Sequence, residues 1–151
     1  MARSNVSIIL QRPKYIQNLG AIVRACACFQ VNTIYWTGDR LDLETVARLP
    51  RELRMKAYQT VRLIRTERPF DLIEDATPVC IELLENAQSL PVFAHPSNAA
   101  YVFGPEDGSV SQVFRRLCHQ FVSIPSRYCV NLAAACNIVL YDRVMKHASK
   151  R

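Results

Sequence analysis

The sequence lacks the short signatures of several common enzyme classes. No Gly-x-Gly-x-x-Gly follows the first strand-like run, and no Gly-x-x-x-x-Gly-Lys-[Ser/Thr] occurs anywhere in the 151 residues. These absences disfavour a standard dinucleotide-binding fold and a P-loop enzyme. The six cysteines contain no Cys-x-x-Cys pair, and only three histidines are present, so we expect no metal site. Most cysteines lie within apolar runs, which is typical of small buried side chains in a reducing compartment.

Long apolar stretches are also absent. No run is long enough to cross a membrane, and the first residues contain no apolar signal region, so we predict a cytoplasmic protein. Hydrophobic residues make up 50% of the chain and charged residues 21%, which is ordinary for a globular protein. The length suits one domain with a core of its own, and we predict a single domain over residues 1–151.

Positive charge exceeds negative charge, with a formal net charge of +6. Residues 40–68 hold eight basic and four acidic side chains, so four of the six excess charges lie in this segment. A concentration of positive charge is compatible with a surface that faces phosphates, and equally with a solvated helix face. The balance therefore indicates a polyanionic partner without identifying one.

Apolar runs that stop at turn residues recur along the chain and alternate with helix-like segments. This order predicts an α/β fold with a mainly parallel sheet. Strands are predicted at Val6–Leu10, Val31–Thr37, Val61–Ile64, Val79–Glu85, Tyr101–Phe103 and Phe121–Ile124. Helices are predicted over Leu19–Phe29 with Asn18 as N-cap, after a capping box at Ser109–Gln112, and from about Asn131.

Two of the predicted helices have unusual faces. The helix Leu19–Phe29 is apolar nearly all round and contains one charge, Arg24. Such a helix is expected to be buried on most sides, so Arg24 needs a ligand or a carboxylate partner, or must extend to solvent. The C-terminal helix has two apolar stripes, the second formed by Ala134, Ile138, Tyr141 and Met145. A second subunit would cover that stripe, and the basic tail from Lys146 is expected to be frayed.

The loop after Tyr101–Phe103 is the strongest candidate for a ligand site. The apolar run stops at Gly104-Pro105, and two carboxylates, Glu106 and Asp107, follow. In an open α/β sheet, ligands bind at the carboxyl ends of the strands. A glycine there allows the backbone to approach a neighbour closely.

Three stretches resemble, in order and context, the three motifs of the TrmH (SpoU) branch of the SPOUT RNA methyltransferases. They are 18–31, 103–108, and Ile124-Pro125 with 129–135. The resemblance implies an α/β fold with helices on both faces of the sheet and a C-terminal trefoil knot, an exception to the usual absence of knots. It also implies S-adenosylmethionine as cofactor, a homodimer with its site near the interface, and methylation of a ribose 2′-hydroxyl in tRNA or rRNA. The small size is similar to that of TrmL-like members, which act on the tRNA anticodon loop.

Site residues follow from matching these motifs position by position. The resemblance implies catalytic roles for Arg24, Asn18 and Glu106. Because an arginine stays protonated, we expect Arg24 to stabilise a developing alkoxide or hold a phosphate instead of acting as a base. The expected cofactor contacts are Ile81, Glu82, Leu83, Gly104, Glu106, Ile124, Pro125, Cys129, Asn131 and Leu132. The expected RNA contacts are Arg12, Lys14, Arg24, Arg51 and Arg54, because no RNA-binding domain precedes the first predicted strand.

One position departs from the family pattern. Cys129 stands where the family commonly has serine, and a thiol is a weaker hydrogen-bond partner than a hydroxyl. Two alternative functions therefore stay open. The first is a SPOUT protein that binds RNA without catalysis. The second is a thiol enzyme with Cys129 as nucleophile and His95 or His119 as base.

Overall fold

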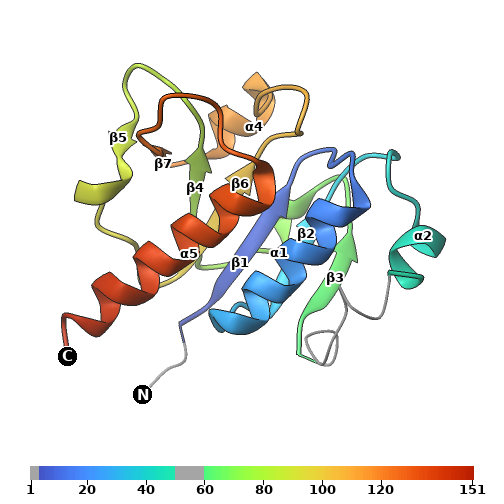
Figure 1. Cartoon of the computed structure of the whole chain (residues 1–151), viewed down its shortest axis with the longest axis horizontal. Helices are drawn as coiled ribbons and strands as arrows, with labels where there is room; N and C mark the ends of the chain where they lie inside the picture. The colour runs from blue at the N-terminus through green and yellow to red at the C-terminus, as the bar shows by residue number, and fades with distance from the viewer. Residues whose placement is uncertain (1–3, 50–59) are drawn as a thin grey trace.

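A computed structural model describes residues 4–49 and 60–151 of the chain. Seven described strands form one sheet in the order β3-β2-β1-β6-β4-β7-β5 (Figure 1), and every pairing between them is parallel. The sheet confirms the predicted α/β class. Its strands are β1 (Val6–Leu10), β2 (Thr33–Trp36), β3 (Arg62–Arg65), β4 (Thr77–Ile81), β5 (Gln88–Ser89), β6 (Ala99–Phe103) and β7 (Gln120–Ser123).

The two central strands, β1 and β6, are buried along their whole length. They run side by side with Ile8 opposite Tyr101 and Leu10 opposite Phe103. Continuous apolar runs of this kind are typical of parallel strands that are covered on both faces. The carboxyl ends of β1 and β6 therefore reach the same edge of the sheet at the same level.

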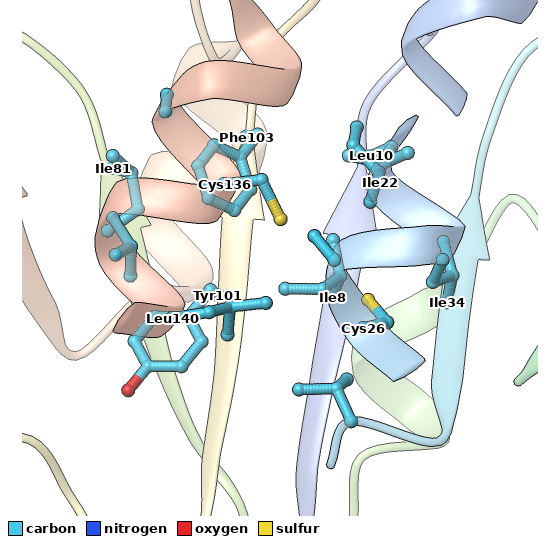
Figure 2. Close-up of a cluster of buried hydrophobic side chains, with 14 of the residues drawn as sticks. Ile8, Leu10, Ile22, Cys26, Ile34, Ile81, Tyr101, Phe103, Cys136 and Leu140 are labelled. Atoms are coloured by element: carbon cyan, nitrogen blue, oxygen red, sulfur yellow. The ribbon is translucent and has the colours of Figure 1, made fainter. Parts of the chain in front are cut away.

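Helices α1 (Ile16–Cys28) and α5 (Leu132–Ala148) pack against each other over one face of the sheet (Figure 1). Figure 2 shows the apolar side chains between them and the strands, with Cys26 and Cys136 on the two helices. Both of these cysteines are buried. Burial, with the neighbouring Cys136 thiol, raises the pKa of Cys26, so Cys26 packs as a small apolar side chain.

The opposite face of the sheet is covered by shorter elements. Helix α4 (Gln112–Leu117) supplies Phe114, and the 3-10 turn η2 (Pro69–Asp71) supplies Phe70. Their rings meet edge to face with centroids 5.0 Å apart. Helices on both faces of the sheet are thus confirmed. The remaining described elements are α2 (Leu43–Ala47) and η3 (Leu90–Val92), which contribute the buried side chains of Val46 and Leu90 to the core.

Several element boundaries differ from the sequence prediction; β2 begins at Thr33 and not at Val31, and β6 begins at Ala99 and not at Tyr101. Helix α1 begins at Ile16, so Asn18 lies in its first turn and is not the N-cap. Helix α4 is capped by Ser111, whose Oγ accepts from the Phe114 N–H, and not by Ser109. Strand β4 ends at Ile81 and not at Glu85, because the chain turns where the Glu82 carboxylate accepts from the Leu83 N–H.

Two expectations, about the burial of α1 and about the tail, also change. Helix α1 is exposed along one side, and Arg24 lies on that side instead of being buried. The alanine and cysteine side chains on this face are small enough to be exposed to solvent, so the apolar pattern overstated the burial of α1. The tail is not frayed at Lys146, whose Nζ donates to the Leu90 and Phe93 carbonyls and pairs with Asp142. The second stripe of α5 is indeed exposed, at Ile138, Tyr141 and Met145.

Candidate active site

A cavity of about 370 Å³ opens at the carboxyl edge of the sheet. Its walls come from the start of α1, the ends of β4 and β6, the segment after β7 and the start of α5. This is the edge at which ligands bind in open α/β sheets. The three sequence motifs, which are far apart along the chain, all contribute to it.

Most of the predicted cofactor residues line this cavity. They are Ile81, Glu82, Leu83, Gly104, Glu106, Ile124, Cys129, Asn131 and Leu132, whereas Pro125 does not line it. Asn18 also lines it, and Arg24 does not. The sequence prediction missed seven lining residues. Five of them lie within the motifs, namely Phe103, Pro105, Gly108, Val130 and Ala135, and two lie beside a motif, namely Tyr15 and Ser126. Their position in or next to a motif was the only signal that could have found them.

The Glu106 carboxylate holds the start of α1. Its Oε2 accepts from the Lys14 N–H at 2.7 Å, and its Oε1 accepts from the Tyr15 N–H at 3.3 Å. The Asn18 side-chain amide also donates to Oε1, at 3.2 Å. A carboxylate at a helix N-terminus accepts from N–H groups that have no intrahelical partner, and its negative charge interacts favourably with the helix dipole. This contact explains why α1 begins earlier than Asn18.

Asn18 also connects the first motif to the third. Its Oδ1 accepts from Asn131 Nδ2 at 3.1 Å. Asn131 is itself the N-cap of α5, where its Oδ1 accepts from the Ala134 N–H. Glu106, Asn18 and Asn131 therefore form one chain of hydrogen bonds that joins all three motifs along a wall of the cavity.

Gly104 is required by its own backbone neighbours. A Cβ at this position would lie 2.6 Å from the Val110 backbone nitrogen and 2.8 Å from the Ser109 carbonyl carbon. The Val110 N–H donates to Glu82 Oε2 at 3.0 Å, which holds the loop backbone at Ser109 and Val110 in place. The absent side chain thus lets the loop after β6 fold back on itself beside the cavity.

A reciprocal pair of hydrogen bonds ties the loop after β1 to the start of α4. Gln11 Nε2 donates to Ser111 Oγ at 2.7 Å, and the Ser111 N–H donates to Gln11 Oε1 at 2.8 Å. Both loops are thereby fixed relative to the sheet edge. A rigid frame of this kind keeps site residues in one geometry.

Basic side chains gather beside the cavity. Asp107 accepts from Arg40 at 2.7 Å and lies 3.7 Å from Lys14 Nζ. The bond to Arg40 lowers the pKa of Asp107, and the same bond raises the pKa of Arg40. Arg12 is exposed, with a positive φ of 48°, and it donates its N–H to Thr37 Oγ1. Of the other predicted RNA contacts, Arg51 and Arg54 lie outside the described residues.

Gly38 makes the turn beside Arg12 possible. It has a φ of +84°, and a Cβ there would lie 2.9 Å from Arg12 Cγ. Left-handed backbone at a non-glycine residue such as Arg12 is uncommon and persists only where surrounding contacts hold it. Here the bond to Thr37 and the close packing of Gly38 supply those contacts.

Arg24 stands apart from the cavity. It lies on the exposed side of α1 and makes no hydrogen bond or ion pair with the described part of the chain. Asn18 and Arg24 are six residues apart on one helix, so their Cα atoms are separated by roughly 9 Å along the axis. The guanidinium is therefore free to meet an external group.

Neither candidate base for a thiol enzyme approaches Cys129. His95 contacts Asp142 on α5 at 2.8 Å, and eleven helical residues separate Asp142 from Asn131 at the cavity, or roughly 16 Å. His119 is exposed and donates its N–H to the Pro78 carbonyl, near the start of β4. The described chain thus supplies no histidine partner for this thiol.

His95 belongs to a buried polar network at the far end of α5. Its Nδ1 bonds the Tyr101 hydroxyl at 2.6 Å, and Arg143 donates to the same hydroxyl at 3.2 Å. Burial lowers the pKa of His95 and raises the pKa of Tyr101 to about 12. Each polar group of this network has a partner, which is the condition for burying them without a large cost. The network anchors α5 to β6 and to the segment before it.

Two classes of feature are missing from the part of the chain that the structure describes. No described helix has both the length and the apolar character needed to cross a bilayer. Residues 4–49 and 60–151 also contain no group of three or more His, Cys, Asp or Glu side chains arranged to hold a metal ion.

Comparison with known proteins agrees with this geometry. The sequence model of the SpoU rRNA Methylase family matches residues 5–141. No curated protein matches the sequence. Among solved structures, the SpoU methyltransferase AviRb from Streptomyces viridochromogenes is similar with a TM-score of 0.83 and 21% identity, covering 99% of this chain and 62% of AviRb. AviRb has also been solved in complex with the cofactor AdoMet.

Two further structures share the fold. The TrmH/SpoU tRNA modifying enzyme of A. aeolicus gives a TM-score of 0.84 at 17% identity, covering 97% of this chain and 77% of that enzyme. An RNA 2′-O ribose methyltransferase gives a TM-score of 0.82 at 15% identity, covering 97% of this chain and 58% of the other. This chain therefore spans about three fifths of the length of AviRb and of this 2′-O ribose methyltransferase.

Proposed function

Because the chain belongs to the SpoU rRNA Methylase family, we propose that it is an S-adenosylmethionine-dependent RNA methyltransferase that modifies a ribose 2′-hydroxyl in tRNA or rRNA. The observation that supports this proposal most is the chain of hydrogen bonds from Glu106 through Asn18 to Asn131. It joins the three motifs around one cavity at the carboxyl edge of the sheet. The trefoil knot and the homodimer that the resemblance implies stay predictions.

The cavity suits the methyl donor in size and in its lining. A volume of about 370 Å³ lies within the range of small-ligand sites, about 300–1,000 Å³. Ile81, Leu83, Ile124 and Leu132 give it apolar walls for a purine ring, and Asn131 adds a polar side chain. When bound, S-adenosylmethionine supplies an electrophilic methyl group on a sulfonium. The residues of this chain must position the ribose oxygen in line with that methyl group.

Glu106 and Asn18 are best assigned as positioning residues. All three donors to Glu106 belong to the segment 14–18, so its carboxylate is occupied in holding that segment. Its oxygens already accept three hydrogen bonds from that segment, so they are not placed to take a proton from a nucleophile. We propose that these two residues keep the start of α1 at the cavity wall and do not react.

Arg24 stands apart from the cavity of its own chain, so we propose that it acts on the reacting ribose in the site of a second copy of the chain. Its guanidinium stabilises negative charge on the 2′-oxygen or holds the adjacent phosphate, and the proton leaves to phosphate or water. The exposed stripe of α5 with Ile138, Tyr141 and Met145 is the surface that we propose a second copy of the chain covers. Tyr141 meets Phe29, next to the end of α1, edge to face at 6.4 Å, so this surface continues toward the helix that carries Arg24.

Methyl transfer to RNA is the direct test. The protein is incubated with isotopically labelled S-adenosylmethionine and with separate pools of tRNA and rRNA, and digested nucleosides are analysed by mass spectrometry. We expect a labelled 2′-O-methylnucleoside from one pool. If S-adenosylmethionine binds but no nucleoside is labelled in either pool, the chain is the non-catalytic RNA-binding protein and the proposal is wrong.

The role of Arg24 is tested in the same assay. Arg24→Ala is expected to lose roughly a hundredfold or more in turnover, as when one charge-stabilising donor is removed. Its affinity for S-adenosylmethionine stays at the wild-type value by calorimetry, because Arg24 does not line the cavity. Arg116→Ala is the matched control, since Arg116 is an exposed arginine on α4. Wild-type turnover in Arg24→Ala would contradict a role for Arg24 in the reaction.

A further inference from the structure

Two exposed tyrosines stand beside the cavity on different walls. Tyr15 immediately precedes α1 and lines the cavity. Tyr128 lies in the segment between β7 and α5, where its neighbours Ser126 and Cys129 line the cavity. Tyr15 is 47% exposed and Tyr128 is 74% exposed. A single exposed aromatic side chain is ordinary, so what distinguishes these two rings is their place beside a binding cavity and the groups around them.

Each of these rings has a cation over it from the preceding residue. Lys14 Nζ lies 5.2 Å from the centroid of the Tyr15 ring. Arg127 Cζ lies 5.4 Å from the centroid of the Tyr128 ring. Both distances fall within the range of cation–π contacts. The same basic–aromatic pair thus occurs twice, once at Tyr15, which lines the cavity, and once at Tyr128, next to the lining residue Cys129.

The hydroxyl groups of Tyr15 and Tyr128 differ in their hydrogen bonding from those of the buried tyrosines Tyr35 and Tyr101. Tyr35 donates its hydroxyl to the Leu72 carbonyl, and the Tyr101 hydroxyl bonds His95. Within residues 4–49 and 60–151, no such bond holds the hydroxyl of Tyr15 or Tyr128. The described fold therefore makes little use of either ring's polar end.

The backbone under both rings is held in place. The Tyr15 N–H donates to Glu106 Oε1. Ser126 Oγ donates to the Tyr128 carbonyl at 2.8 Å and lies 3.3 Å from the Ile124 carbonyl. Surfaces fixed before binding lose less conformational freedom when a partner arrives.

The charge around the rings favours an anionic partner. Lys14 shares Asp107 with Arg40, so a row of basic groups leads away from Tyr15 across the loop after β6. Arg127 supplies a separate positive charge beside Tyr128. Exposed aromatic rings interleaved with basic side chains are the features that bind unpaired nucleic acid, where bases stack on rings and phosphates meet the cations.

We propose that Tyr15 and Tyr128 are stacking surfaces for unpaired bases of the RNA that flank the ribose in the cavity, and that Lys14 and Arg127 contact its phosphates. This inference rests on the proposed function, because it assigns the RNA contacts of that same cavity. Bases in a duplex stack on one another and cannot spread onto protein rings. The site therefore selects a single-stranded loop over a helix.

RNA binding measured without catalysis is the test. A short fluorescein-labelled single-stranded RNA and the same sequence as a blunt duplex are titrated with the protein at fixed salt, followed by anisotropy. Tyr15→Ala and Tyr128→Ala are each expected to weaken binding to the single strand about tenfold and to leave the duplex unchanged. Tyr15→Phe and Tyr128→Phe are the matched variants, and both retain wild-type binding because the stacking face stays. Melting temperature and oligomeric mass are measured for each variant.

The cations are tested through salt dependence. Lys14→Ala and Arg127→Ala are each expected to reduce the slope of log affinity against log salt concentration by about 1, as for one lost phosphate contact. An unchanged slope in both variants would contradict phosphate contact by these residues. Arg116→Ala is again the exposed control.

Several results would overturn the inference. If both alanine variants bind single-stranded RNA as the wild type does, neither ring is an RNA contact. A Phe variant as weak as its Ala variant would assign the effect to the hydroxyl and not to stacking. A lower oligomeric mass in Tyr128→Ala would assign that ring to a second copy of the chain, and lost S-adenosylmethionine affinity with unchanged RNA binding in Tyr15→Ala would assign Tyr15 to the cofactor. If stacking is confirmed while no RNA pool is methylated, the proposed function fails and the inference stands.

Discussion

The side chain of Asn131 donates a hydrogen bond to the side chain of Asn18, and so joins the first turns of α5 and α1 across 113 residues of sequence. The Asn18 side-chain amide in turn donates a hydrogen bond to Glu106 Oε1. One wall of the cavity therefore depends on amides that must present a donor to one neighbour and an acceptor to the other. A carboxylate of the same shape cannot do both.

Asn131→Asp tests this link. Aspartate keeps the oxygen that caps α5 at the Ala134 N–H, and it is as good an N-cap as asparagine. It replaces the donor to Asn18 by a second acceptor. We expect a loss of about 0.5–1.5 kcal/mol in the free energy of unfolding, measured by urea denaturation, and weaker binding of S-adenosylmethionine by calorimetry. Asn86→Asp, at an exposed asparagine after β4, is the control for the added charge; equal effects in both variants would contradict the prediction.

Two glycines in one loop give a second prediction. A Cβ at Gly104 would lie 2.6 Å from the Val110 nitrogen, whereas at Gly108 the nearest atom is Pro105 Cγ at 3.4 Å. We expect Gly104→Ala to cost about 1–3 kcal/mol, because backbone must move to admit the methyl group, and to weaken cofactor binding with it. Gly108→Ala should leave both quantities near wild type. Similar unfolding curves for the two variants would mean that the loop adjusts more freely than the structure indicates.

The sequence could predict the class of the sheet and the edge that holds the site. Apolar runs such as Val6–Leu10 identify buried strands, and the Gly-Pro-Glu-Asp turn identifies a strand end with a functional loop. The strand order was beyond such reasoning. Strands buried on both faces have no alternation that would indicate their neighbours, and the two-residue β5 is too short to show any period.

Roles that depend on distant contacts were also out of reach. The helix start at Ile16 depends on the Glu106 carboxylate, 91 residues away from Tyr15, so local rules placed the cap at Asn18. The burial of α1 was overstated because Ala21 and Cys28 count as apolar in a pattern although they tolerate a surface. Four cysteines are buried as expected, but Cys28 and Cys129 are exposed, which only packing against the rest of the chain decides.

Cys129→Ser separates methyl transfer from thiol chemistry. The change restores the residue that the family commonly has, and the Cys129 side chain is exposed beside the cavity. We expect methylation of RNA to be retained or increased, because a hydroxyl is the better hydrogen-bond partner. A loss of all activity in Cys129→Ser would instead support a nucleophilic thiol.

The buried His95 makes stability depend on pH. Burial lowers the pKa of His95 below its usual 6.5, with Asp142 opposing that shift and Lys146 and Arg143 adding to it. Burial lowers the pKa of the adjacent His147 too. Because the unfolded chain then binds more protons than the folded chain, stability is complete above about pH 6.5 and is lost as the pH falls below it.

We expect the free energy of unfolding to decrease below pH 6.5 with a contribution from His95 of up to about 1.4 kcal/mol per pH unit, measured by urea denaturation at a series of pH values. His95→Gln removes this titration, so its curve should be flatter than that of the wild type over the same range, even if the variant is less stable throughout. His119→Gln controls for the loss of an exposed histidine and should leave the slope unchanged. A slope in His95→Gln equal to that of the wild type would place the pH dependence elsewhere. A flatter slope would show that the network of His95, Tyr101 and Asp142, at the opposite end of α5 from the cavity, holds this helix through an uncharged imidazole.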